Sequence, residues 1–352
     1  AYCNGVYSSR RIAKAARERV DFMSVVGLDP PDFRTVSDFR KRHLKALAGL
    51  FGQVLKLCEQ TGFVKLGHVA LDGTKIKANA SKHKAMSYER MAKRAAELDA
   101  EVERWLSAAE AGDAAEDKAF GRDRSGEELP DWIADKKKRA EKIRAAKAEP
   151  EAEAKAAAVK ARAQAEAEDK RKAEGRKKRG KPAAPPSEKP DPKAQKNFTD
   201  PESRIMKTKD GFIQGYNAQA AVDATAQVIV AHGLDARQSD QHQLTPIADA
   251  IEASLGRKPA QLSADAGYCS DANLAALEER RIDAYIAPGQ AKHAADGEGG
   301  GARIVAMREK IRAGGHDSPY RLRKQLPEPV FGQIKQARGF RQFLMRGVEK
   351  VA

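Results

Sequence analysis

The sequence predicts a mixed α/β protein with an N-terminal helical region and a long charged insertion. Apolar residues recur at spacings of three and four through the first sixty residues, which is typical of amphipathic helices. Short apolar runs later alternate with helical patterns, and a segment dominated by Ala, Lys, Arg and Glu separates the two parts. The expected organisation is a helical region at 1–66, a first core strand at 67–81, the insertion at 82–196 and the rest of the α/β core at 197–352.

The composition points to a polyanionic partner. The chain has 352 residues, and its 65 Lys and Arg against 50 Asp and Glu give a net charge of +15. Nucleic acid is the first candidate for such a basic chain. No stretch approaches the roughly 18 apolar residues of a membrane span and no signal peptide is recognisable, so we expect a cytoplasmic protein. The three cysteines are far apart, which argues against a disulfide framework and a Cys-based zinc site.

Two helices are expected in the N-terminal region. Ser8 and Ser9 can cap a helix that continues to about Val26, before two prolines break the chain. A longer helix follows Thr35 or Ser37, with an apolar stripe that continues to Cys58 and a C-cap glycine at Gly62. We interpret the stripe as part of a core.

The pattern then changes to that of a strand. Residues 68–71 read as a short strand that ends at Asp72-Gly73. In the insertion, residues 131–180 hold 17 Lys and Arg against 10 Asp and Glu and few large apolar residues. We therefore expect long exposed helices or a loose coiled arm, followed by a stiff Pro-rich linker at 182–192.

Strands and helices alternate after the linker. Residues 214–223 and 226–232 read as a hairpin, and a glycine-rich loop at 297–301 matches no phosphate-binding pattern. The final helix is expected to start near Glu328 and to carry a basic face. The basic residues of that face are Lys335, Arg338, Arg341 and Arg346. Between the hairpin and this helix we expect helix 243–255, strand 260–264, helix 270–280 and strand 283–287.

Three carboxylates stand at positions suited to a site. Asp72 and Asp265 each follow a predicted strand, and Glu328 opens a helix before a proline. Singly, each has an ordinary explanation as a turn residue, a helix cap or a helix-dipole charge. Together, without nearby Cys and with few His, they suit Mg²⁺ or Mn²⁺, and two such ions can assist phosphodiester cleavage.

Several blocks of the sequence resemble the DDE transposases of bacterial insertion sequences. The resemblance is to the IS-four/IS-five superfamily, nearest the "eleven-eighty-two" branch. The blocks are 68–81 (HVALDGTKIKANAS), 215–223 (GYNAQAAVD), 264–268 (ADAGY), 328–335 (EPVFGQIK) and 338–347 (RGFRQFLMRG). The resemblance implies an RNase H-like core, a two-metal mechanism of DNA cleavage and strand transfer, and a nucleoid-associated location. It also implies double-stranded DNA as partner, both as inverted-repeat ends and as target, and a homodimer in the DNA complex.

The resemblance assigns roles to particular residues. Asp72, Asp265 and Glu328 become the catalytic triad and the ligands of two Mg²⁺ or Mn²⁺ ions. Lys335 matches the lysine of the family's tyrosine–arginine–glutamate–lysine signature, whereas Arg321 and Lys324 occupy the tyrosine and arginine positions. Tyr320 and Arg323 are neighbouring candidates for that signature. We expect DNA contacts from Lys75, Lys77, Lys335, Arg338 and Arg341.

Some alternatives remain open at this point. Asp223 is a rival ligand, Asp240 and His242 are interpreted as caps of the following helix, and Tyr216 and Asn217 are candidates to support the site. The chain lacks an initiator Met and stops at Ala352, which suggests a fragment or a truncated reading frame. A DNA-binding remnant without activity and a stand-alone RNase H-fold nuclease are the competing functions.

Overall fold

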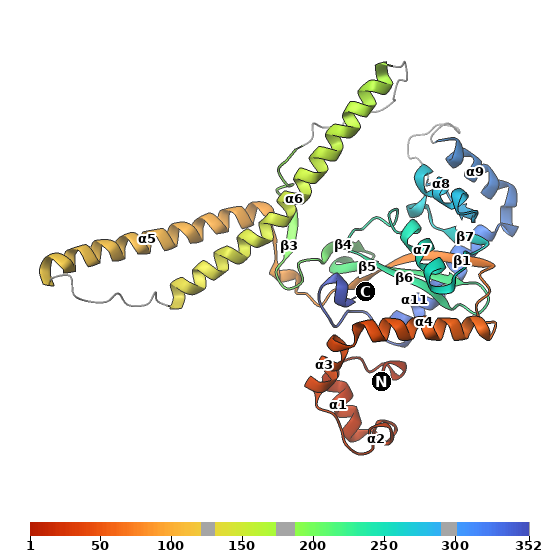
Figure 1. The fold of residues 1–352 in the computed structure, drawn as a ribbon, viewed down its shortest axis with the longest axis horizontal. Coiled ribbons are helices and arrows are strands. Elements are labelled where there is room, and N and C mark those ends of the chain that lie inside the picture. The colour runs from red at the N-terminus through yellow and green to blue at the C-terminus, as the bar shows by residue number, and fades with distance from the viewer. Residues whose placement is uncertain (121–130, 174–186, 290–300, 352) are drawn as a thin grey trace. The chain divides into compact units, whose positions relative to one another are not determined.

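The computed structural model describes residues 1–120, 131–173, 187–289 and 301–351 (Figure 1). The chain forms two compact units, residues 1–80 with 202–352 and residues 81–201. The described part contains no helix that is long and apolar enough to cross a membrane. The first unit holds all three predicted carboxylates.

The N-terminal region is helical, with more breaks than predicted. Its helices are α1 (Ser9–Glu18), α2 (Val20–Val26), α3 (Phe33–Arg42) and α4 (Leu44–Gln60), after a 3-10 turn at Tyr2–Asn4. The predicted first helix is interrupted at Arg19, whose backbone is extended and whose guanidinium bonds Asp21. The predicted second helix divides at His43, and α4 ends at Thr61 and the predicted Gly62, whose φ of 80° is the left-handed conformation typical of a helix-terminating glycine.

A six-stranded mixed sheet forms the centre of the first unit. Its strands are β1 (His68–Lys77), β4 (Arg204–Thr208), β5 (Gly211–Asp223), β6 (Ile229–Asp235), β7 (Gln261–Ala264) and β8 (Asp283–Ile286). The order is β4-β5-β1-β7-β8, and β6 also pairs with β5. β1 pairs antiparallel with β5 and parallel with β7, and β7 is parallel to β8. The predicted hairpin is confirmed as β5 and β6, and the mixed α/β class is confirmed.

The first strand does not end at Asp72, as the sequence suggested. β1 continues to Lys77 because β5 extends beside it, with Gly73 opposite Gln219 and Lys77 opposite Gly215. A Cβ atom at Gly215 would lie 2.5 Å from the carbonyl oxygen of Ile76, so only glycine permits this close pairing. The Asp-Gly pair, an ordinary turn signal, is here part of a long central strand.

Helices cover both faces of the sheet. α4, α7 (Leu244–Leu255), α8 (Asp271–Glu279) and α9 (Ala302–Gly314) pack on the face that carries Val69 and Leu71. The short helices α10 (Leu322–Gln325) and α11 (Pro327–Gly332) pack on the opposite face, against Ala70. Because side chains alternate along a strand, Asp72 projects on the same face as Ala70, toward α11.

The predicted final helix is shorter and more irregular than expected. α11 passes into a π-helical turn at Gln333–Ala337, and after Arg338 the chain runs alongside Lys77. Arg341 and Arg346 therefore lie outside the helix, and the prediction that the final helix carries all of these basic residues on one face is wrong. A short helix α12 (Val348–Val351) follows. 3-10 turns at Ala266–Tyr268, Gly315–Asp317 and Pro319–Arg321, and the helix α9, were not predicted.

The second unit contains the charged insertion. Long helices α5 (Tyr88–Phe120) and α6 (Asp131–Ala173) follow a 3-10 turn at Lys82–Lys84, and strand β2 (Ala85–Ser87) pairs with β3 (Gln195–Asn197). A small apolar seam joins the two helices, formed by Met91, Ala95, Leu98, Ala140 and Ile143. The prediction of long helices without a large core thus agrees with the structure. Residues 182–186 of the predicted Pro-rich linker and most of the glycine-rich loop lie outside the described residues.

Candidate active site

Two of the predicted carboxylates lie next to each other where the pairing of β1 with β7 ends. β1 and β7 run parallel, and their last paired positions are Leu71 and Ala264. Asp72 and Asp265 are the next residues on each strand. Because neighbouring strands lie only about 4.8 Å apart, this register brings the two aspartates close together at the carboxyl end of β7.

Backbone N–H groups hold both aspartates. The Gly73 N–H donates to Oδ1 of Asp72 and the Gly267 N–H donates to Oδ1 of Asp265, each at 2.7 Å. Asp265 thereby caps the 3-10 turn that follows β7, whereas Ser270 caps α8. Each aspartate is oriented and keeps its other oxygen available.

Glu328 approaches from the helix layer. Leu326 and Val330 on either side of it pack against Ala70, Ala220 and Val222 of the sheet, which fixes α11 over the strand that carries Asp72. Glu328 itself is exposed, and no hydrogen bond or ion pair of its carboxylate occurs among the described residues. The negative charge of Glu328 contributes to the raised pKa of Asp72, which indicates that the two carboxylates repel each other.

The pKa of Asp72 is raised to about 6, mainly because burial penalises the carboxylate. The hydrogen bond from Gly73 opposes this shift, whereas the negative charges of Asp265, Asp240 and Glu328 add to it. Among the described residues, none of these four carboxylates forms an ion pair, so the site concentrates negative charge. A divalent cation would relieve this repulsion.

Asp240, which sequence reasoning interpreted as a helix cap, belongs to this site. Helix α7 begins after Gln243, without a side-chain cap, so the cap interpretation of Asp240 and of His242 is wrong. Oδ1 of Asp240 instead accepts hydrogen bonds from Asn217 and Gln219 of β5, at 2.6 and 2.8 Å. The signal in the sequence was the polar, alternating pair Asn217 and Gln219 in the middle of a largely buried strand.

A buried tyrosine supports this arrangement. Tyr268 donates its hydroxyl to Oε1 of Gln219, and burial first, then the nearby aspartates, raises its pKa. The amide of Gln219 is thereby fixed with its nitrogen toward Asp240. Tyr216, another predicted supporting residue, is fully buried, and its ring packs edge-on against Phe343.

Asp223 lies elsewhere. It pairs with Val69, near the start of β1, and is fully buried. Its oxygens accept hydrogen bonds from the N–H groups of Leu66 and Thr225, each at 2.8 Å. Asp223 thus holds two chain turns together, and the structure does not bring it to the other carboxylates.

Lys335 lies close to the carboxylates. Its ammonium donates to Oγ1 of Thr74 and, at 3.0 Å, to the carbonyl of Lys75. Burial lowers its pKa, the charges of Arg341 and Lys75 lower it further, and Asp72 opposes them. Lys75 is partly buried on the same strand, and Lys77 is exposed at the strand end.

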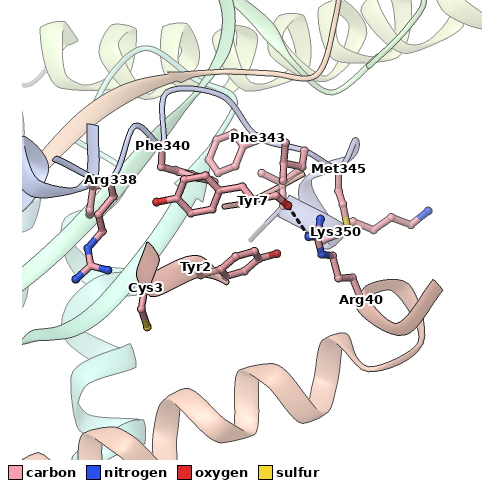
Figure 2. A pocket seen from close by; sticks show the side chains of 12 residues that line it. Tyr2, Cys3, Tyr7, Arg40, Arg338, Phe340, Phe343, Met345 and Lys350 are labelled. Atoms are coloured by element: carbon pink, nitrogen blue, oxygen red, sulfur yellow. Dashed lines mark hydrogen bonds between the residues drawn. The ribbon is translucent and has the colours of Figure 1, made fainter. Parts of the chain in front are cut away.

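The other two predicted DNA-binding residues, Arg338 and Arg341, follow the π-helical turn in the chain. Arg341 donates through Nε to the carbonyl of Lys335 at 3.1 Å, and its own carbonyl accepts from the N–H of Lys77. Arg338 lines a pocket of about 410 Å³ (Figure 2). Aromatic rings and further cations line the same pocket, among them Tyr2, Tyr7, Phe340, Phe343, Arg40 and Lys350.

Tyr320 and Arg323, the neighbouring candidates for the tyrosine and arginine of the family signature, contact each other. The guanidinium of Arg323 stacks over the ring of Tyr320, 4.7 Å from its centre. Burial raises the pKa of Tyr320, and the charge of Asp265 contributes to that shift, so this pair borders the carboxylates. Arg321 and Lys324, which occupy the family's aligned positions, are exposed.

The donor set fits a hard divalent cation. In the ranges that the structure describes, no three acidic, His or Cys side chains gather tightly enough to hold an ion between them. The chemistry of the donors nevertheless suits Mg²⁺ or Mn²⁺, because Asp72, Asp265, Asp240 and Glu328 offer oxygen ligands only. The raised pKa of Asp72 indicates that their charges act on one another.

Comparison with known proteins adds two findings. A family model described as a transposase DDE domain matches residues 187–352, and a model described as a transposase domain matches residues 1–42. Together they cover more than half of the chain, including Asp265 and Glu328, whereas Asp72 lies between the matched ranges. No curated protein and no solved structure gives a significant match.

Proposed function

This chain belongs to the DDE transposases of insertion sequences. We propose that it cuts and joins DNA with Asp72, Asp265 and Glu328 as its catalytic residues. Membership of the family gives the function as DNA transposition, a nuclease and strand-transfer activity. The observation that carries the assignment of residues is the parallel register of β1 and β7, which makes Asp72 and Asp265 neighbours. The branch of the family stays a prediction.

Divalent cations complete this proposal. Asp72 and Asp265 would hold them from β1 and from the end of β7, and Glu328 would hold them from α11. Two ions bound there would activate the attacking oxygen and stabilise the leaving one during phosphodiester cleavage. The charges around Asp72 support the proposal, because four carboxylates that form no ion pair within the described ranges favour binding of Mg²⁺ or Mn²⁺.

The basic residues near the site are proposed to bind phosphates. Lys335 lies against β1 beside Asp72, and Lys75, Lys77 and Arg341 continue along the same strand end. Arg338 extends this set toward the pocket that it lines. We further propose that the substrates are the inverted-repeat ends and a target duplex, and that two copies of the chain act together on them.

A cleavage assay on the wild-type chain tests this function. The DNA is a linear fragment that carries the gene with its natural flanking sequences on both sides. With Mg²⁺ we expect cuts at the boundaries of the element, and with EDTA we expect binding without cuts. Uncut DNA in Mg²⁺ and in Mn²⁺, although bound, would instead favour a DNA-binding remnant.

A further inference from the structure

Asp240 lies between the two chain segments that carry the catalytic aspartates. A Cβ atom at Gly73 would lie 2.7 Å from Oδ1 of Asp240, and one at Gly267 would lie 3.4 Å from Oδ2. Gly73 directly follows Asp72, and Gly267 donates its N–H to Asp265. The absence of a side chain at Gly73 is therefore what admits the Asp240 carboxylate to this place, whereas the contact at Gly267 shows that Oδ2 lies next to the segment of Asp265.

The two oxygens of Asp240 are used differently. Oδ1 accepts both amide hydrogen bonds, from Asn217 and Gln219. Only the nitrogen of an amide can face a carboxylate, so the orientation of these two side chains is determined. Within the described chain Oδ2 has no hydrogen-bond partner, so β5 holds Asp240 by one oxygen and leaves the other toward Gly267.

A second oxygen without a partner belongs to the same hydrogen-bonded group. Asn217 is fully buried, and its Oδ1 atom has no hydrogen-bond partner among the described residues. Buried polar atoms are rarely left unpaired, because desolvation without a partner is unfavourable. A water molecule in the hydration shell of a nearby ion would satisfy this oxygen.

The charge of Asp240 is not balanced within the described chain. Asp235 and Asp283 pair with Arg237 and Lys310, respectively, whereas no Lys or Arg in the described ranges forms an ion pair with Asp240. A partly buried carboxylate beside two others is unfavourable unless a cation joins them. The site therefore holds one more negative charge than the triad provides.

We propose that Asp240 is a fourth carboxylate of the cation site, which β5 positions through Asn217 and Gln219 so that its charge and Oδ2 strengthen cation binding. The inference rests on the proposed function, because it assumes that Asp72 and Asp265 bind divalent cations. It assigns Asp240 as a positioning residue for the cations rather than as a member of the triad.

The test is a calorimetric titration of the full chain with Mn²⁺, without DNA. Asp240→Asn keeps the acceptor for Asn217 and Gln219 but removes the charge, so we expect Mn²⁺ affinity to fall about 10- to 100-fold. The melting temperature of the cation-free protein should be unchanged or higher, because one repelling charge is gone. Asp240→Glu, which keeps the charge, should retain more of the affinity than Asp240→Asn.

Asp210→Asn is the matched control, because Asp210 is exposed in the turn between β4 and β5. It should bind Mn²⁺ like the wild type. Wild-type Mn²⁺ affinity in Asp240→Asn would overturn the inference alone, and a lower melting temperature with that affinity would make Asp240 a purely structural residue. Absence of Mn²⁺ binding by the wild-type chain would overturn the inference and the cation site of the proposed function together.

Discussion

Glu328→Gln should abolish DNA cleavage and leave DNA binding intact. Glutamine keeps the size of the side chain on α11, but it lacks the negative charge that a divalent cation requires. Glu328 is exposed and its carboxylate makes no hydrogen bond in the described structure, so the substitution should not disturb folding. We expect the cleavage rate in Mg²⁺ to fall by more than about 100-fold, since even indirect disturbance of metal ligands has effects of 10- to 100-fold.

The measurement compares cleavage and gel-shift binding on the same DNA fragment. Glu309→Gln is the matched control, because Glu309 is exposed on α9. This substitution removes the same charge from a position outside the carboxylate site. It should cut like the wild type. Normal cleavage by Glu328→Gln would remove Glu328 from the site.

Asp72→Asn should stabilise the cation-free protein at neutral pH. Burial and the neighbouring carboxylates raise the pKa of Asp72 from 3.8 to about 6. The folded state then binds this proton more tightly than the unfolded state, so the contribution of Asp72 to stability decreases as pH rises from about 4 to about 7. A shift of this size corresponds to about 3 kcal/mol at pH 7.

Urea unfolding in EDTA at pH 4, 5, 6 and 7 measures this effect. The free energies of unfolding of wild type and Asp72→Asn should agree near pH 4, where the carboxyl group is protonated, and differ by up to about 3 kcal/mol at pH 7. Asp210→Asn should show no such growth of the difference with pH. A constant difference over the whole range would mean that Asp72 is not held in a repelling cluster.

Much of the fold could be predicted because its elements are locally specified. The segment from β5 to β8 has short β-branched and apolar runs separated by helices of ordinary length, and its elements agree with the predicted ones. The first strand could not be bounded, because Asp72-Gly73 reads as a turn until β5 is known to lie beside it. The final helix was predicted too long, because its end depends on pairing of the chain after Arg338 with Lys77.

The candidate site was predictable only in part. Asp72 and Asp265 each follow an apolar run, and parallel pairing of those runs is sufficient to make them neighbours. Asp240 follows no strand directly, and its position depends on hydrogen bonds to a strand about twenty residues earlier. No local pattern encodes such a contact. Asp223 shows the reverse case, a carboxylate at a strand end that serves only backbone hydrogen bonds.

Iron-mediated cleavage of the protein tests most directly whether the three carboxylates share a cation. Fe²⁺ can replace Mg²⁺ at oxygen ligands, and with ascorbate and peroxide it generates radicals that cut the polypeptide near the bound ion. We predict cuts clustered around residues 72, 265 and 328, identified by mass spectrometry and suppressed by excess Mg²⁺. Cuts confined to other segments, or cuts at these three that Mg²⁺ does not suppress, would contradict the account.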